Sequence, residues 1–209
     1  MVELSSPEME RVARLYAKAK KIIIECEEFG ELQKSNIAVL IELRAAFDHF
    51  MRCISNNFSE DAKDDEYQKK QIEDTTMHIV RAACSSLIGL SISVLMQISK
   101  NMDSINADAI ATVFPEYYSK YINKIKIAKE EIYKYTNKKK DVFFTEDIDK
   151  LIEKINELRQ INQEIEAHLP DMVRIQKGIK KPFTRQAALI SSIIGLILLG
   201  VGVLIGRII

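Results

Sequence analysis

Glycine and proline are scarce in this chain of 209 residues, at 7 and 4. Both residues mark turns and interrupt helices, so their scarcity favours long helices with few breaks. Strand-like alternation of apolar and polar residues is missing too, and apolar positions recur at helical spacing throughout. The sequence therefore predicts an all-α fold, a helical bundle.

Net charge is absent as well, because 30 basic and 30 acidic residues cancel. The overall charge thus gives no reason to expect binding to nucleic acid or to a membrane surface. The three cysteines, Cys26, Cys53 and Cys84, are an odd number and lack metal-ligand spacing. We expect them to be reduced, buried thiols of a cytosolic domain.

The sequence also lacks the motifs of several functional classes. The N-terminal residues MVELSSPEME include no apolar stretch, so we expect no signal peptide. No P-loop, GxSxG, HExxH or EF-hand spacing occurs, which argues against a nucleotide hydrolase, an esterase or a metalloenzyme. We expect no cofactor and no bound metal.

One long apolar run is present at the C-terminus, where residues 187–206 carry no charge. A helix of this length extends about 30 Å and matches the hydrocarbon core of a bilayer, so we predict a single C-terminal transmembrane helix. Cations gather on its N-terminal side. The positive-inside rule then predicts a protein of the inner (cytoplasmic) membrane with its N-terminal domain in the cytoplasm. The cations expected beside anionic lipid are Arg174, Lys177, Lys180, Lys181 and Arg185.

Small residues share one face of the predicted membrane helix, interrupted by Leu199. Small side chains let helix backbones approach each other in lipid, so this face predicts a homo-oligomer. The alternative is a simple tail anchor whose glycines are neutral, because glycine is common in membrane helices. The residues of this face are Ala188, Ser192, Gly195, Gly202 and Gly206.

The chain ahead of this helix divides by composition into three parts. The stretch 84–99 within the first part is apolar on all sides, yet it is short and interrupted by serines. We predict a buried core helix there rather than a second membrane span. The predicted division is a cytoplasmic helical bundle (1–144), an amphipathic helix (145–170), a basic juxtamembrane linker (171–186) and the transmembrane helix (187–206), with bundle helices near 5–30, 36–54, 67–98 and 115–140.

The amphipathic helix carries apolar residues at alternating spacings of three and four, with Asn162 in one core position. Such a heptad pattern is typical of a helix that self-associates in fixed register. The alternative is an ordinary bundle helix, since Ile152 and Ile161 widen the apolar stripe. Pro170 is expected to end this helix. The heptad residues are Ile148, Leu151, Ile155, Leu158, Asn162, Ile165 and Leu169.

Three histidines are candidates for chemistry. His168 lies near the expected helix end and should be solvated, and His78 lies on the third predicted helix. His49 follows Arg44 with four residues between them. This spacing resembles the R-x4–6-H motif of the HEPN superfamily, all-helical bundles that include many metal-independent RNases. The resemblance implies that Arg44 would stabilise a pentacoordinate phosphate and His49 would transfer protons, where two protomers meet.

A non-catalytic interpretation of the same residues stays open. Arg44 could pair with Asp48 on the helix surface, and His49 could be hydrogen-bonded at the edge of the core. Ala45 also departs from the polar residue that commonly follows the arginine in active members of the superfamily. Whether the chain is an enzyme is therefore left open, with the balance against it.

A HEPN-like bundle joined to one membrane helix is similar in architecture to the small membrane accessory proteins of type VI-B CRISPR systems. This resemblance implies a homo-oligomeric membrane pore that perturbs the membrane in antiviral defence, beside an RNA-guided nuclease. Two alternatives stay open. One is a membrane-tethered HEPN-type RNase, and the other is a tail-anchored adaptor without activity of its own.

Lysines and tyrosines are interleaved in the fourth predicted helix. This composition suits single-stranded RNA, through phosphate neutralisation and base stacking. A solvated lysine face is the plainer interpretation. The lysines that would contact RNA are Lys120, Lys124, Lys138, Lys139 and Lys140.

Overall fold

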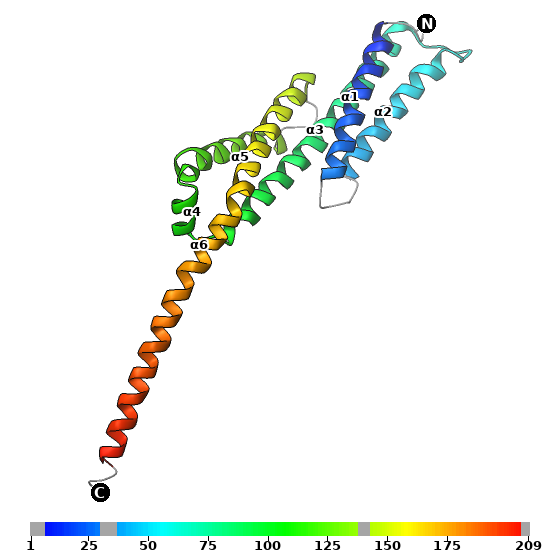
Figure 1. Ribbon diagram of the computed structural model, residues 1–209. Coiled ribbons are helices and arrows are strands. Elements are labelled where there is room, and N and C mark those ends of the chain that lie inside the picture. The colour runs from blue at the N-terminus through cyan, green and yellow to red at the C-terminus, as the bar shows by residue number, and fades with distance from the viewer. Residues whose placement is uncertain (1–6, 30–36, 138–142, 206–209) are drawn as a thin grey trace.

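The computed structural model describes residues 7–29, 37–137 and 143–205, with side chains up to residue 178. Regular structure within these ranges is helical throughout, which confirms the all-α prediction. Figure 1 shows a bundle from which a single long helix runs toward the C-terminus. The elements are α1 (Pro7–Phe29), α2 (Ile37–Asn56), α3 (Asp65–Asp103), α4 (Ala107–Val113), the π-helical turn η1 (Tyr117–Tyr121), α5 (Ile122–Thr136) and α6 (Thr145–Ile205).

The central element is α3, which packs against α1, α2, α5 and α6 (Figure 1). Its inward positions include the small residues Ala82, Ala83 and Ser91, all fully buried, which let neighbouring helices approach closely. The Ser91 hydroxyl donates to the Leu87 carbonyl of the same helix, so this buried polar group is satisfied. One face of the stretch 84–99 is thus buried among other helices, whereas Ile92 and Met96 on its other face are exposed.

The helices whose side chains are described differ in how apolar they are. Among these, only α3 is long and apolar enough to cross a membrane, and 56% of its most apolar window is buried inside the protein. A core helix has the same composition, so this criterion alone does not locate α3 in a membrane. The predicted span 187–206 lies outside the part with described side chains, and its backbone is helical as far as Ile205.

The heptad face of α6 is buried within the chain. Ile148, Leu151, Leu158 and Ile165 are fully buried, and α3 is the main partner of α6. Asn162 accepts a hydrogen bond from the Asn101 amide of α3 at 3.3 Å, so its polar group faces another helix of the same chain. The self-association expected through this face is therefore wrong. The bundle-helix alternative holds, because the apolar stripe is already covered.

Pro170 does not end this helix, because α6 continues from Thr145 to Ile205. Proline removes one backbone donor and disturbs the preceding turn. Residues beyond it are nevertheless fixed to the bundle, since Met172 is fully buried and the Gln176 amide donates to the Ser104 carbonyl at 3.0 Å. These contacts favour an uninterrupted helix over a break. The segment predicted as a linker, 171–186, is accordingly helical.

The helix predicted near 115–140 is present as η1 followed directly by α5, but the short helix α4 ahead of Pro115 was not predicted. Asn106 caps a short helix, α4, by accepting from the Ala109 amide at 2.8 Å. This helix ends where Phe114 leaves the helical region (φ −136, ψ 61). The residue before a proline avoids the α conformation, which explains the break. The break before Pro115 lets this part of the chain fold around the end of α3 and the middle of α6 (Figure 1).

Candidate functional site

A polar cluster lies between α2 and α3, and we call it the histidine cluster. Glu42 and His49 are seven residues apart, two turns along one face of α2. Gln71, Asp74 and His78 follow the same helical spacing on α3. The two faces meet, so residues from two distant segments converge in one place.

The two imidazole rings stack, with centroids 5.3 Å apart and an angle of 19° between the ring planes. His78 Nδ1 lies 2.8 Å from Glu42 Oε2, and His49 Nδ1 lies 2.9 Å from Gln71 Oε1. Asp74 Oδ2 lies 3.7 Å from His49 Nδ1. Glu42 and Gln71 are buried, whereas both histidines are partly exposed.

These contacts set the tautomers of the two histidines. A carboxylate and an amide oxygen only accept hydrogen bonds, so the Nδ1–H of each ring is the donor. In its neutral form each ring then carries its lone pair on Nε2, the atom that a general base uses. In many active sites a buried carboxylate orients the histidine that acts as the base, and Glu42 is placed to do this for His78. The cluster is thus chemically suited to moving protons.

The structure does not bring Arg44 and His49 together within one chain. Five residues along a helix correspond to about 140° around its axis, so the two side chains leave α2 in different directions. His49 faces α3, while Arg44 is exposed. The alternative Arg44–Asp48 pair is not formed either, because Asp48 bonds Arg52 at 2.5 Å. The HEPN-type role of Arg44 and His49 stays a prediction.

Sequence reasoning singled out His49 but missed its partners Glu42 and Gln71. His78 was considered only by its place on a helix. These partners could have been suspected because polar residues recur on the inward faces of two amphipathic helices, where apolar residues are usual. That signal does not say which two helices pair.

The described lysines proposed to contact RNA already lie near acidic groups. Lys120 is 3.9 Å from Glu116, and Lys124 is 3.9 Å from Glu157. Lys120 also lies over the Tyr121 ring, 5.0 Å from its centroid. These contacts reduce the local positive charge available to phosphate. RNA contact stays a prediction, and Lys138, Lys139 and Lys140 lie outside the described residues.

The residues predicted to contact the membrane are described only in part. Arg174 is exposed and lies 3.0 Å from Asp171, and Lys177 is exposed on the next turn. The others lie in the part of α6 whose side chains are outside the description, and Gly206 lies outside it altogether. These others are Lys180, Lys181, Arg185, Ala188, Ser192, Gly195 and Gly202.

His168 and the cysteines play no part in the histidine cluster. His168 is half-buried and stacks on Phe114 with centroids 4.4 Å apart, so the prediction that it is solvated is wrong. Packing of α4 against α6 covers one side of this ring. All three cysteines are free, as expected; Cys53 and Cys84 are buried and Cys26 is half-buried.

Among the described residues, no group of three or more His, Cys, Asp or Glu side chains is arranged to hold a metal ion. Comparison with protein-family models, with curated proteins and with solved structures gives no match to this chain. The HEPN and type VI-B resemblances therefore rest on the Arg44/His49 spacing and the architecture alone.

Proposed function

We propose that this chain is a membrane-anchored effector that homo-oligomerises through residues 187–206 and perturbs the membrane. The observation that supports it is the continuity of α6, which runs for 61 residues from Thr145 to Ile205. At 1.5 Å per residue this helix is about 90 Å long. One rigid element thus joins the core of the bundle to the uncharged C-terminal run.

The two ends of α6 have different environments. Its first half is part of the bundle core, with Leu151 and Leu158 fully buried, and its second half extends away from the other helices (Figure 1). A helix that protrudes alone gains stability where a bilayer covers its apolar residues. The cations at Arg174 and Lys177 lie on the bundle side of that run, which favours a cytoplasmic bundle.

In this proposal the small-residue face of the membrane helix makes the contacts between copies. One membrane helix per chain means that a pore needs several copies, and an apolar lining would make it unselective. The antiviral role beside an RNA-guided nuclease comes from the architectural resemblance. It predicts that phage defence requires assembly in the membrane.

The test is to replace residues 187–206 in the full-length protein by an uncharged 20-residue leucine-rich helix. This variant keeps the anchor but removes the small-residue face. We expect the native protein to form a discrete large oligomer in detergent and to release ions from vesicles, and the variant to do neither. Equal behaviour of both proteins would reject assembly through this face, and a monomer without ion release in both would favour the inert adaptor.

A membrane-tethered, metal-independent RNase is a second candidate, favoured by the stacked His49 and His78 rings and their fixed tautomers. Two imidazoles could act as base and acid while a ribose 2′-OH attacks the phosphate. The test is cleavage of labelled single-stranded RNA by the full-length protein in a chelator. Loss of cleavage in His49→Asn and His78→Asn variants with unchanged oligomer mass would support this candidate, and no cleavage by the native protein would reject it.

A further inference from the structure

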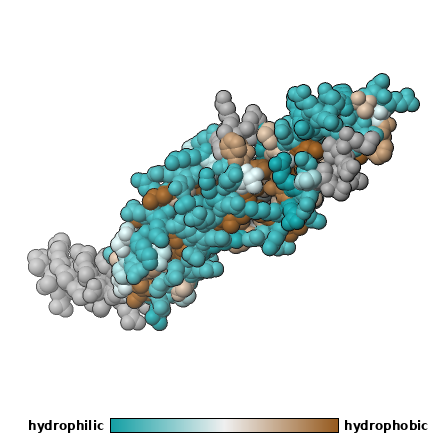
Figure 2. All heavy atoms as spheres, turned by 90° about the horizontal axis from the view of Figure 1, so that it is seen from above, coloured by the Kyte–Doolittle hydropathy of each residue, from teal (hydrophilic) through white to brown (hydrophobic). Residues whose placement is uncertain are grey.

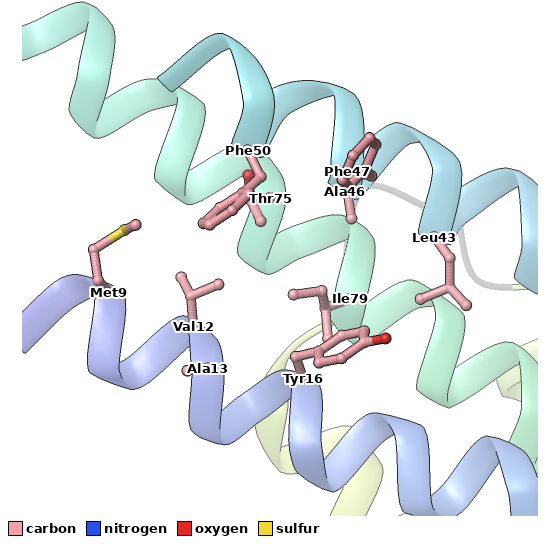
Figure 3. A pocket seen from close by; sticks show the side chains of 10 residues that line it. All are labelled: Met9, Val12, Ala13, Tyr16, Leu43, Ala46, Phe47, Phe50, Thr75 and Ile79. Atoms are coloured by element: carbon pink, nitrogen blue, oxygen red, sulfur yellow. The ribbon is translucent and has the colours of Figure 1, made fainter. Parts of the chain in front are cut away.

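The helices α1 and α2 both pack on α3, and an apolar groove with a volume of about 490 Å³ lies between them (Figure 3). From α1 it is lined by Met9, Val12 and Tyr16, and from α2 by Leu43, Phe47 and Phe50. Side chains of α3 form its floor. The groove therefore lies where a further helix would complete a four-helix arrangement.

A second apolar feature adjoins this groove on the outer face of α2. Ile37, Leu40, Phe47 and Met51 are exposed, and together with Arg44 between Leu40 and Phe47 they follow alternating three- and four-residue spacing. Phe47 belongs both to this stripe and to the groove, so the two form one continuous patch. The outer surface is otherwise largely hydrophilic, although apolar side chains interrupt it in places (Figure 2). A continuous exposed apolar patch of this kind marks an interaction surface.

The bilayer that would receive residues 187–206 does not reach this patch. In Figure 1, α1 and α2 lie at the end of the molecule opposite to the C-terminal end of α6. The patch must therefore be covered by protein rather than by that membrane. A covering helix would present apolar residues at three- and four-residue spacing, as the outer face of α2 itself does.

We propose that the occupant is a second copy of this chain, whose outer α2 stripe packs against the groove and α2 of the first. A two-fold contact needs one patch that complements itself, and here each chain offers both the helix stripe and the groove. The charges agree with this pairing. Arg44 lies within the stripe, and no described residue forms a hydrogen bond or ion pair with it. Asp48, one turn further on, binds Arg52 of its own chain through Oδ2, and its Oδ1 can accept a hydrogen bond from the arginine of the other copy.

This contact differs from the one implied by the HEPN resemblance. His49 faces α3 and is bonded to Gln71, so the α2 contact buries Arg44 without bringing the histidines of two copies together. It also uses a different surface from the membrane helix. The contact can therefore form whether or not residues 187–206 assemble.

The test is crosslinking of the full-length protein by a short bismaleimide after Phe47→Cys substitution. Tyr133→Cys on α5 is the matched control, because the two native side chains are similarly exposed, at 64% and 67%. We expect covalent dimers from the α2 variant to exceed those from the control about tenfold or more, since a bound pair holds its thiols at millimolar effective concentration. Equal yields would overturn the proposal.

A second substitution separates a specific contact from random collision. Leu40→Asp added to Phe47→Cys should abolish the crosslink, whereas Ile127→Asp should leave it intact; the native side chains are 52% and 53% exposed. The same crosslink should persist when residues 187–206 are replaced by the leucine-rich helix. If the crosslink is lost when residues 187–206 are replaced but not with Leu40→Asp, the contact belongs to the membrane helix and the α2 interface is rejected.

Discussion

A single buried carboxylate, that of Glu42, fixes the orientation of the histidine pair. It is 5% exposed and accepts a hydrogen bond from His78 at 2.8 Å. A buried carboxylate is stable only with partners that replace water, and an imidazole Nδ1–H is one such partner. Because His78 stacks on His49, the orientation of one ring constrains the other.

The Glu42→Ala substitution should lower the free energy of unfolding by about 2–3 kcal/mol, because it leaves the His78 Nδ1–H without its charged acceptor. Glu42→Gln, which keeps an acceptor oxygen, should cost clearly less. Denaturation of the full-length protein in mild detergent, followed by circular dichroism, measures both values. Equal costs for the two variants would mean that the hydrogen bond does not carry the effect.

Cys26 should be unreactive at neutral pH. Burial, followed by the charge of Glu25, raises its pKa from 9.0 to about 12. At pH 8 its thiolate fraction should be roughly 1000-fold below that of an ordinary cysteine. Alkylation by iodoacetamide, measured by mass spectrometry, should be slow in the folded protein and fast in urea. Rapid alkylation of folded Cys26 would contradict the raised pKa.

The same pKa predicts a direction for stability. Between pH 9.0 and about 12 the unfolded chain loses the Cys26 proton that the folded chain keeps. The unfolded state then binds fewer protons, so the free energy of unfolding falls as the pH rises through this window. Below pH 9 the thiol is protonated in both states and contributes no pH dependence.

At the scale of elements, α6 joins three segments that the sequence predicted as separate: the amphipathic helix, the linker and the C-terminal apolar helix. Its N-terminal half completes the core against α3, and the same helix continues past Pro170 toward the C-terminus. Burial of Met172 and the hydrogen bond from Gln176 hold the helix on the bundle beyond the proline. One continuous helix thus connects the bundle core to the apolar run.

The intrachain burial of the heptad face predicts the effect of Leu158→Ala. A fully buried leucine truncated to alanine should cost about 2–5 kcal/mol of unfolding free energy. The cost should not change with protein concentration, because the contact lies within one chain. Ile127→Ala on the surface of α5 is the control and should change stability by less than about 0.5 kcal/mol. A concentration-dependent cost would restore the self-association interpretation.

Continuity across Pro170 can be measured directly. Spin labels at Lys150→Cys and Lys177→Cys, in a protein whose native cysteines are replaced, are 27 positions apart and both native side chains are exposed. An unbroken helix predicts a narrow distribution centred near about 40 Å. A broad or much shorter distribution in pulsed electron resonance would place a break between them.

At the scale of the whole molecule, two apolar segments are candidates for a membrane span, α3 and residues 187–206. The helix α3 is apolar enough, yet 56% of its most apolar window is buried by other helices. Removing it from the bundle would expose the matching faces of α1, α2 and α6, which opposes insertion. The helix backbone of the C-terminal run extends away from the bundle (Figure 1).

In the proposed topology residues 187–206 span the membrane and both ends of α3 lie in the cytoplasm. Cysteines introduced singly at Lys69 and Lys100, near the two ends of α3, should both be protected from an impermeant maleimide in intact spheroplasts. Both should react after lysis, because both ends of a core helix lie on the same side. Labelling of only one of them in intact spheroplasts would show that α3 spans the membrane.

The sequence by itself determined that the chain is helical, because helical periodicity and the scarcity of glycine and proline are local properties, but it predicted neither α4 nor the helical segment 171–186. It also marked the stretch 84–99 as core and the run 187–206 as a candidate span, since both follow from composition. Only the tertiary structure decided which helix covers which face. The heptad pattern of α6 is the same whether α3 or another copy of the chain buries it. Whether the helix continues past Pro170 depends on contacts of Met172 and Gln176 with the bundle, and the pairing of Glu42 with His78 depends on α2 packing against α3.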